Sequence, residues 1–248
     1  MAERWRAGAF VWRELSTGDV DGARRFYGEL FGWSFKPEDM GPAGIYWLAE
    51  RGGRQLCGMV QKPAATPAAW LSYVLVDDVD AAAARCLAAG GTVVRAAQDI
   101  PDIGRFAVIA DPWGASLAPF RSRGGEAAET PRPSAGSFCW ETLVAPDPKA
   151  ALGFYSQVIG FGTAPAPSGE GTLFTAGEDM VADVQTARPE APARWTSYVQ
   201  VEQAEAWRDR AVRLGGKVVV PRVEVPKVGT VAFVTDPGGA GLGLFQLR

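Results

Sequence analysis

Apolar and polar positions change their spacing repeatedly along the chain, and each change predicts one element. Phe10–Ser16 is rich in residues that favour strands. From Val20 to Leu30 the apolar residues recur at spacings of three and four, which places them on one stripe of a helix. Asp19 or Thr17 can cap the start of this helix. The chain therefore begins with a strand followed by an amphipathic helix.

The same order then starts again. Short strands are predicted at Tyr46–Ala49 and Leu56–Gln61, and a new strand at Leu71–Val76. A helix follows at Val79–Ala89, and Gly90-Gly91 ends it. Three further strands are predicted at Thr92–Arg95, Gly104–Ala110 and Ala115–Phe120. The repeated unit is thus β-α-β-β-β, and we call it a module.

The second half of the chain repeats the first. FVWRELSTGDVDGARRFYGELFGW, from Phe10, matches FCWETLVAPDPKAALGFYSQVIGF, from Phe138. SYVLVDDV, from Ser72, matches SYVQVEQA, from Ser197. We predict four modules in two domains, residues 1–120 and 136–248. The linker between them, residues 121–135, contains glycine, proline and charge but no apolar period.

These motifs resemble the vicinal oxygen chelate superfamily, which includes glyoxalase I, bleomycin-resistance proteins, extradiol dioxygenases and fosfomycin-resistance enzymes. The resemblance rests on Asp-x-x-x-Ala-x-x-Phe-Tyr followed by Gly32, on Gly90-Gly91, and on the Asp-Pro-x-Gly turns Asp111–Gly114 and Asp236–Gly239. The FVWREL opening is similar to two-domain actinobacterial members called glyoxalase-like or hydroxylase-like. The resemblance implies an α+β fold, in which four βαβββ modules form two tandem domains with curved mixed sheets.

The resemblance also implies where metal ligands would lie. In metal-using members four ligands, typically His or Gln and Glu, come from inward-facing strand positions. Carried over, these positions fall on or near Trp12, Gly58, Leu71 and Ala118, and on or near Trp140, Ala182, Thr196 and Gly243. None is a common ligand of a divalent ion, and a shift by one residue reaches only Asp183 and Ser72 or Ser197. Carbonyl oxygens and isolated carboxylates remain as an alternative for Mg²⁺ or Ca²⁺. We expect no metal and no other cofactor, which disfavours glyoxalase I chemistry and iron-dependent ring cleavage.

The composition excludes several kinds of catalysis and several kinds of partner. The 248 residues include no histidine, so Asp, Glu, Lys, Tyr, Cys and water remain for proton transfer. A net charge of −3 argues against a nucleic-acid partner. No apolar run is long enough to span a membrane, and the first residues lack the apolar region of a signal peptide. Cys57, Cys86 and Cys139 are isolated, which favours a reduced, cytoplasmic setting.

Glu14 is the predicted catalytic residue. Strand alternation places Phe10, Trp12 and Glu14 on one face, and a carboxylate beside an apolar ring has a raised pKa. A structural carboxylate, paired with Arg13, Arg105 or a backbone amide, is the alternative interpretation. Thr142 replaces Glu14 in the second domain, so the two domains are not equivalent.

The aromatic content predicts a ligand as well as a core. Nine tryptophans and twelve phenylalanines offer stacking surface for a flat or hydrophobic molecule. Arg105 and Lys227 lie near the start of the last long strand of each domain, where either can bind an anionic or carbonyl group of a ligand. Core packing and solvated surface charge are the structural alternatives. The predicted substrate-binding residues are Phe10, Trp12, Trp47, Trp70, Tyr73, Arg105, Phe106, Trp140, Thr142, Trp195, Tyr198 and Lys227.

Three functions follow from these observations. The first is a metal-independent enzyme that tailors a hydrophobic or aromatic natural product by isomerase, cyclase or lyase chemistry, with a carboxylate as acid and base. The second is a non-catalytic protein that sequesters an antibiotic or metabolite. The third is a sensing or interaction module with a filled cavity. The difference between Glu14 and Thr142 favours the enzyme. Because the duplication pairs two domains within one chain, we expect a monomer or a homodimer.

Overall fold

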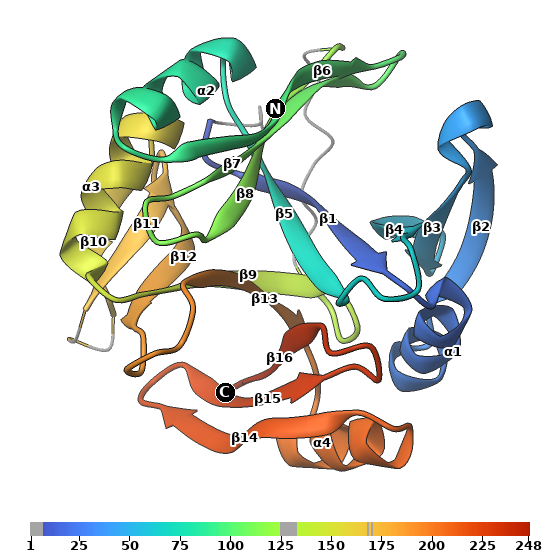
Figure 1. Cartoon of the computed structure of the whole chain (residues 1–248). Helices are drawn as coiled ribbons and strands as arrows, with labels where there is room; N and C mark the ends of the chain where they lie inside the picture. The colour runs from blue at the N-terminus through green and yellow to red at the C-terminus, as the bar shows by residue number, and fades with distance from the viewer. Residues whose placement is uncertain (1–6, 125–132, 168, 170) are drawn as a thin grey trace. The chain divides into compact units, whose positions relative to one another are not determined.

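The structure is a computed structural model that describes residues 7–124, 133–167, 169 and 171–248. The described residues contain the βαβββ module four times, as predicted (Figure 1). The first two modules are β1 (Phe10–Thr17), α1 (Val20–Phe31), β2 (Ser34–Asp39), β3 (Ile45–Arg51) and β4 (Arg54–Gln61), then β5 (Ala69–Leu75), α2 (Val79–Ala88), β6 (Thr92–Ile100), β7 (Gly104–Ala110) and β8 (Ser116–Ser122). The last two are β9 (Phe138–Ala145), α3 (Pro148–Ile159), β10 (Gly162–Pro165), β11 (Thr172–Ala176) and β12 (Asp179–Thr186), then β13 (Arg194–Gln200), α4 (Ala204–Arg213), β14 (Lys217–Val225), β15 (Gly229–Thr235) and β16 (Gly241–Leu247).

The strands form two eight-stranded mixed sheets, which confirms the predicted α+β class. Their orders are β2-β3-β4-β1-β5-β8-β7-β6 and β10-β11-β12-β9-β13-β16-β15-β14. Within each module the last strand runs parallel to the first, as β4 does to β1 and β16 does to β13. The remaining pairs within a module are antiparallel hairpins. Each module therefore closes on its own first strand.

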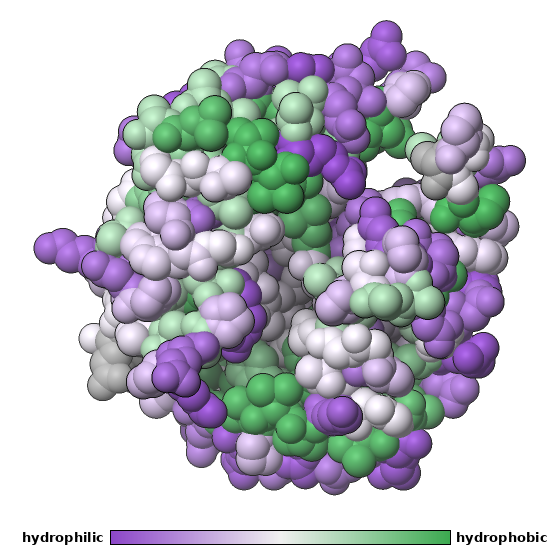
Figure 2. All heavy atoms as spheres, in the orientation of Figure 1, coloured by the Kyte–Doolittle hydropathy of each residue, from purple (hydrophilic) through white to green (hydrophobic). Residues whose placement is uncertain are grey.

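The edge strands are the hardest to recognise in the sequence. The pattern does not predict β2, because SFKPED is charged and contains a proline. Pro37 in β2, Pro165 in β10 and Pro221 in β14 all lie in outermost strands, which tolerate proline better than central strands because they pair on one side only. Figure 2 shows apolar surface where β14 and β15 lie, and Val218, Val219 and Val223 of β14 are exposed. Proline in an exposed strand discourages pairing with another chain.

Side chains set the ends of three helices. Asp19 caps α1 by accepting the Gly22 N–H at 2.8 Å, which decides between the two predicted caps. Asp78 and Asp147 cap α2 and α3 in the same way. α1 ends at Phe31, and the following Gly32 has φ +72°, a left-handed conformation that glycine adopts without strain.

Packing groups the modules differently from the sequence repeat. The second module packs with the third in one compact unit, and the first packs with the fourth in the other. In the first unit α2 contacts α3, and the core includes Val74, Ile109 and Val158. In the second unit α1 contacts α4, and the core includes Leu15 and Leu244. The predicted domain boundaries stay predictions, and most of the predicted linker, residues 125–132, lies outside the described residues, as do residues 1–6.

A buried chain of hydrogen bonds holds the second unit together. Trp70 donates its indole N–H to the Tyr27 hydroxyl at 3.1 Å, and that hydroxyl donates to the Asp236 carboxylate at 3.0 Å. Asp236 also accepts the Ala240 N–H at 2.8 Å, within the Asp-Pro turn. Tyr27 is fully buried. The Phe-Tyr motif of α1 is thus bonded to the Asp-Pro turn of the fourth module.

The first unit repeats this chain with its own residues. Trp195 donates to the Tyr155 hydroxyl at 2.9 Å, and Tyr155 donates to Asp111 at 3.2 Å. Asp111 accepts the N–H groups of Trp113 and Ala115, both at 2.9 Å. Burial raises the pKa of both Tyr155 and Asp111, which favours their neutral forms. The two sequence motifs of the family therefore meet in space as partners.

Removing either tyrosine hydroxyl should weaken the fold. Tyr27→Phe leaves the Trp70 indole N–H without its partner and removes one hydrogen bond from the buried Asp236 carboxylate, so we expect a loss of about 1–3 kcal/mol in the free energy of unfolding. Tyr155→Phe should cost a similar amount. Tyr46→Phe, at a half-buried hydroxyl, is the control and should cost less. Urea unfolding followed by circular dichroism measures all three, and equal costs would contradict the structural role of the buried pair.

Stability should also fall in alkali. Burial, reinforced by the neighbouring Asp236 or Asp111 carboxylate, raises the pKa of Tyr27 and Tyr155 well above the usual value near 10. Above about pH 10 the unfolded chain loses these protons while the folded chain keeps them. The stabilisation is therefore complete below pH 10 and declines as the pH rises toward the folded pKa. Unfolding free energies between pH 9 and 11.5 should decline less steeply in Tyr27→Phe and Tyr155→Phe.

Candidate active site

The strands of the first module carry core side chains on one face only. Leu15 and Met59 are paired across β1 and β4, and both are fully buried in the core. Glu14 and Gly58 are the adjacent pair, so they face the opposite side. We call the side opposite the core residues the open face. Trp12 lies two residues before Glu14 on the same strand and shares the open face.

A tyrosine fills the side-chain space of Gly58. A Cβ atom added to Gly58 would overlap the Tyr46 hydroxyl, so the phenol of β3 lies directly over this glycine. Trp12 donates its indole N–H to the Tyr46 hydroxyl at 2.8 Å. Because Gly58 is the cross-strand partner of Glu14, the hydroxyl lies next to the strand position that carries Glu14. Trp12, Glu14 and Tyr46 thus form one polar group on the open face.

Sequence reasoning missed Tyr46, although a signal existed. Gly58 lies inside the apolar run Leu56–Val60, and a glycine within a strand often marks the close approach of another group. Tyr46 could not be identified as that group, because its reach over β4 depends on the β3–β4 hairpin.

The arrangement suits proton transfer. The Tyr46 oxygen accepts a hydrogen bond from Trp12, which polarises the hydroxyl and strengthens it as a donor. Glu14 supplies a carboxylate on β1, at the position paired with Gly58 beneath the Tyr46 hydroxyl. Trp12, Glu14 and Tyr46 are all half-buried, so they stay accessible while water is partly excluded. A carboxylate base and a phenol donor side by side can remove a proton and stabilise the resulting oxyanion.

The third module carries its carboxylate on a different strand. Thr142, the counterpart of Glu14, is paired with Asp183 of β12. Thr142 donates to one Asp183 oxygen at 2.5 Å, and Gln185 donates to the other at 2.8 Å. The position expected near Ala182 is therefore taken by Asp183, because Ala182 faces the core. This face holds a fixed negative charge.

Two aromatic clusters lie on open faces, one in each compact unit. In the first unit Tyr73 packs against Phe106 and Phe120, with ring centroids 5.7 and 6.3 Å apart. All three strand positions alternate with core residues. Tyr73 and Phe106, two predicted ligand-binding residues, are therefore brought together. Their rings are buried against each other, so they offer edges rather than full faces.

The second unit has the matching cluster. Tyr198 packs against Phe233 and Phe245 at 5.2 and 6.3 Å, and Trp140 lies against this cluster. A Cβ atom on Gly243 would overlap the Tyr198 ring, so Tyr198 fills the space of this glycine. Tyrosine rings thus cover glycines at two of the positions that correspond to metal ligands.

Four predicted aromatic ligands belong to the packing instead. Trp70 and Trp195 point into the cores, where each indole N–H is bonded to a tyrosine of a helix. Phe10 is buried in the first core, stacked on Phe161 and tilted against Trp195. Trp47 packs against α1, and the guanidinium of Arg24 in this helix lies 3.5 Å from the centroid of the Trp47 ring. Strand alternation shows which residues share a face, but it does not show which of the two faces a helix covers. The sequence therefore could not distinguish these core positions from positions on the open face.

The two predicted cationic contacts lie at the surface. Arg105 donates to Asp80 of α2 at 2.8 Å and to Asp99 of β6 at 3.1 Å. These hydrogen bonds raise the pKa of the Arg105 guanidinium above its usual range. Lys227 is exposed in the β14–β15 turn, with φ +65°.

The residues present do not fit a divalent metal. Across the described ranges, no three carboxylate or thiol side chains gather closely enough to hold an ion. At the corresponding strand positions stand an indole at Trp12 and a phenol over Gly58. These groups are poor ligands for the ions that this fold usually holds.

Comparisons with known proteins place the chain among glyoxalase-fold proteins. Residues 12–118 match the family described as glyoxalase-like domain, and residues 140–244 match the glyoxalase/bleomycin resistance protein/dioxygenase superfamily. The glyoxylase candidate CFP32 of Mycobacterium tuberculosis is 31% identical over 95% of this chain and 94% of its own length. The anthracycline biosynthesis protein DauV of Streptomyces sp. strain C5 is 32% identical over 99% of this chain and 95% of its own.

Solved structures share the fold at low identity. The Mn(II)-bound glyoxalase of Novosphingobium aromaticivorans superposes with a TM-score of 0.65 and 14% identity, over 98% of this chain and 83% of its own. The 2,3-dioxygenase LapB of Pseudomonas sp. KL28 gives 0.63 and 14%, over 98% and 93%. None of the described helices is long and apolar enough to cross a membrane.

Filling the two glycine positions should disturb the tyrosines. A methyl group at Gly58→Ala or Gly243→Ala overlaps a tyrosine side chain, so the ring must move, and we expect a loss of about 1–3 kcal/mol in unfolding free energy. Gly58→Ala should also change the tryptophan fluorescence, because Tyr46 leaves Trp12. Gly241→Ala is the control, since its Cβ meets no atom within 4 Å. Unchanged fluorescence and stability in Gly58→Ala would contradict the described contact.

Proposed function

We propose that this chain, which belongs to the glyoxalase/bleomycin resistance protein/dioxygenase superfamily, is a metal-independent enzyme that transfers a proton on a hydrophobic or aromatic small molecule. The observation that carries the proposal is the group formed by Glu14, Tyr46 and Trp12 on the open face of the first module. It supplies a base on β1 and a hydrogen-bond donor on β3 that lies over β4, the strand between them. Both lie next to Trp12 and Gly58, the positions that correspond to metal ligands in metal-using relatives.

The reaction is written as acid–base chemistry. The Glu14 carboxylate takes a proton from a carbon next to a substrate carbonyl, and the C–H electron pair moves to form an enolate. The Tyr46 hydroxyl donates a hydrogen bond to the enolate oxygen, as the indole N–H of Trp12 holds it in place. Protonated Glu14 returns the proton to the same or another carbon. Return to a different carbon gives isomerisation, and loss of a leaving group from the enolate gives lyase chemistry.

Metal independence is supported by what occupies the strand positions. Trp12 and the phenol over Gly58 fill space that a coordinated ion would need, and their polar atoms are bonded to each other. The hydrogen-bond donor takes over the role that a Lewis acid has in polarising a carbonyl.

The substrate class is inferred from two observations. Relatives over nearly the whole chain are named as anthracycline biosynthesis proteins, and anthracyclines are flat aromatic compounds. The open face also presents the Trp12 indole beside the polar group, and a flat ring can stack on an indole while its carbonyl meets Tyr46. A tailoring step on an aromatic natural product fits both.

A binding function without turnover is the second candidate. It is favoured by the third module, where both oxygens of Asp183 already accept hydrogen bonds from Thr142 and Gln185. A carboxylate fixed in this way acts as a stationary negative charge, which suits a cationic ligand more than proton removal.

Deuterium exchange tests the enzyme proposal. In D₂O, removal and return of a substrate proton adds deuterium, which mass spectrometry detects whatever product is formed. We would incubate the protein with anthracyclines, anthraquinones and aromatic ketones. Glu14→Gln should lower the exchange rate about 10²- to 10⁴-fold, while ligand binding, measured by tryptophan fluorescence, persists. Glu29→Gln, an exposed carboxylate of α1, is the matched control and should exchange like the wild type.

The outcomes separate the candidates. Exchange that survives Glu14→Gln would refute the role of Glu14. Tight binding with no exchange by the wild type would favour the binding protein over the enzyme. Exchange that disappears on dialysis against a chelator and returns with a divalent ion would overturn metal independence.

A further inference from the structure

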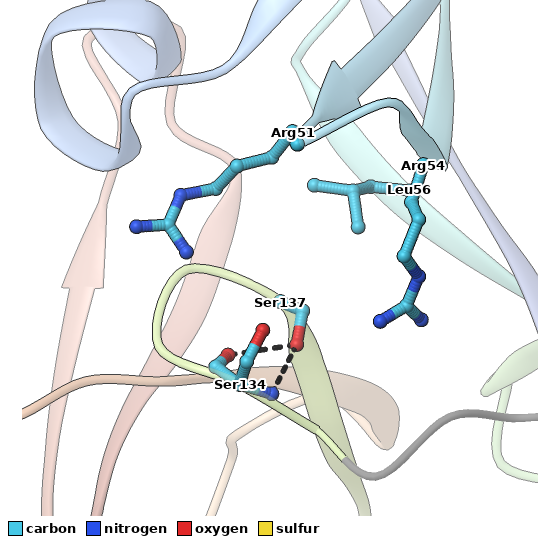
Figure 3. A pocket seen from close by; sticks show the side chains of 6 residues that line it. Arg51, Arg54, Leu56, Ser134 and Ser137 are labelled. Atoms are coloured by element: carbon cyan, nitrogen blue, oxygen red, sulfur yellow. Dashed lines mark hydrogen bonds between the residues drawn. The ribbon is translucent and has the colours of Figure 1, made fainter.

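The β3–β4 hairpin and the turn before β9 line a cavity that is separate from the Glu14 group. This cavity of about 440 Å³ lies within the second compact unit. Figure 3 shows Arg51 and Arg54 at its two sides, with Leu56 between them and Ser134 and Ser137 opposite. The volume suits a small ligand.

The hairpin places the two arginines at opposing strand positions, with one guanidinium on each side of the cavity. Arg51 and Arg54 are direct cross-strand partners, and Gly52 and Gly53 form the two-residue turn with φ of +59° and +79°. Like charges directly opposite each other destabilise a strand pair. Among the described residues, neither guanidinium takes part in an ion pair. An anion between them would remove this repulsion.

The opposite wall is rigid and polar. The Ser137 hydroxyl donates to the Ser134 carbonyl at 2.7 Å and accepts the Ser134 N–H at 2.8 Å. The turn is fixed from behind by Trp33, whose indole N–H donates to the Gly136 carbonyl at 2.7 Å. Because Ser137 is bonded within the turn, the exposed Ser134 hydroxyl remains as a group that can turn toward a ligand.

Gly136 positions one of the guanidiniums. A Cβ atom on Gly136 would lie 2.9 Å from Arg51 Cζ, so the guanidinium packs directly on this glycine. With φ +81°, the position also favours glycine conformationally. The Arg51 fork is thus pre-oriented, which lowers the entropy lost when it binds an anion.

We propose that this cavity binds the phosphate group of a small molecule. Two guanidiniums and a serine hydroxyl provide donors in several directions, which matches the oxygens of a tetrahedral phosphate. Leu56 supplies an apolar surface for the part of the ligand beyond the phosphate. This site is independent of the Glu14 group and of the reaction proposed for it.

Titration with inorganic phosphate tests the site. At constant ionic strength, isothermal titration calorimetry should detect one phosphate per chain, and phosphate should raise the melting temperature above that in chloride. Arg51→Gln and Arg54→Gln should each weaken phosphate binding at least about tenfold, the loss expected for one charged hydrogen-bond donor. Arg213→Gln, which removes the same charge from exposed α4, is the control.

The controls decide the result. Circular dichroism checks that the variants fold, and Arg54, whose side chain is exposed, is the variant least expected to disturb folding. Acetate tests a carboxylate in the same cavity, and binding of acetate as tight as that of phosphate would overturn the assignment to phosphate. Equal phosphate affinity in Arg54→Gln and Arg213→Gln, or no heat of binding in the wild type, would overturn the site itself.

Discussion

The buried bond between a helix tyrosine and the aspartate of a distant turn is the constraint on which the fold depends. Tyr27 and Tyr155 are fully buried, so each hydroxyl must find a partner inside the protein. Each finds an Asp-Pro turn that comes from another module, and each is oriented by an indole. This requirement explains why modules from opposite halves of the sequence share a core, since neither partner is complete within its own half.

The same constraint divides the tryptophans into two groups. Trp70 and Trp195 donate within the cores, where they stabilise the tyrosines. Trp12 instead donates to Tyr46 on the open face, and Trp140 packs against the aromatic cluster around Tyr198. A high tryptophan content therefore reflects both architecture and a surface available for a ligand. Only the second group supports the proposed chemistry.

Much of the fold was predictable because the repeat supplied the same evidence several times. The module order, a helix cap at Thr17 or Asp19, and the shared face of Trp12 and Glu14 all follow from local sequence patterns. The candidate site was harder to predict from the sequence. Tyr46 lies over Gly58, the partner of Glu14, only because of the β3–β4 hairpin, and the pairing of Asp183 with Thr142 depends on strand register, which sequence spacing does not determine. Tertiary contacts, rather than propensities, select these residues.

The covered glycine has an evolutionary consequence. Because the phenol of Tyr46 occupies the side-chain space of position 58, a histidine or glutamate introduced there would collide with it. Removal of the phenol alone would leave a hole beside Trp12 and an indole N–H without this partner. Either single replacement is unfavourable, so the residues at positions 46 and 58 constrain each other, and a change at one is tolerated best with a change at the other.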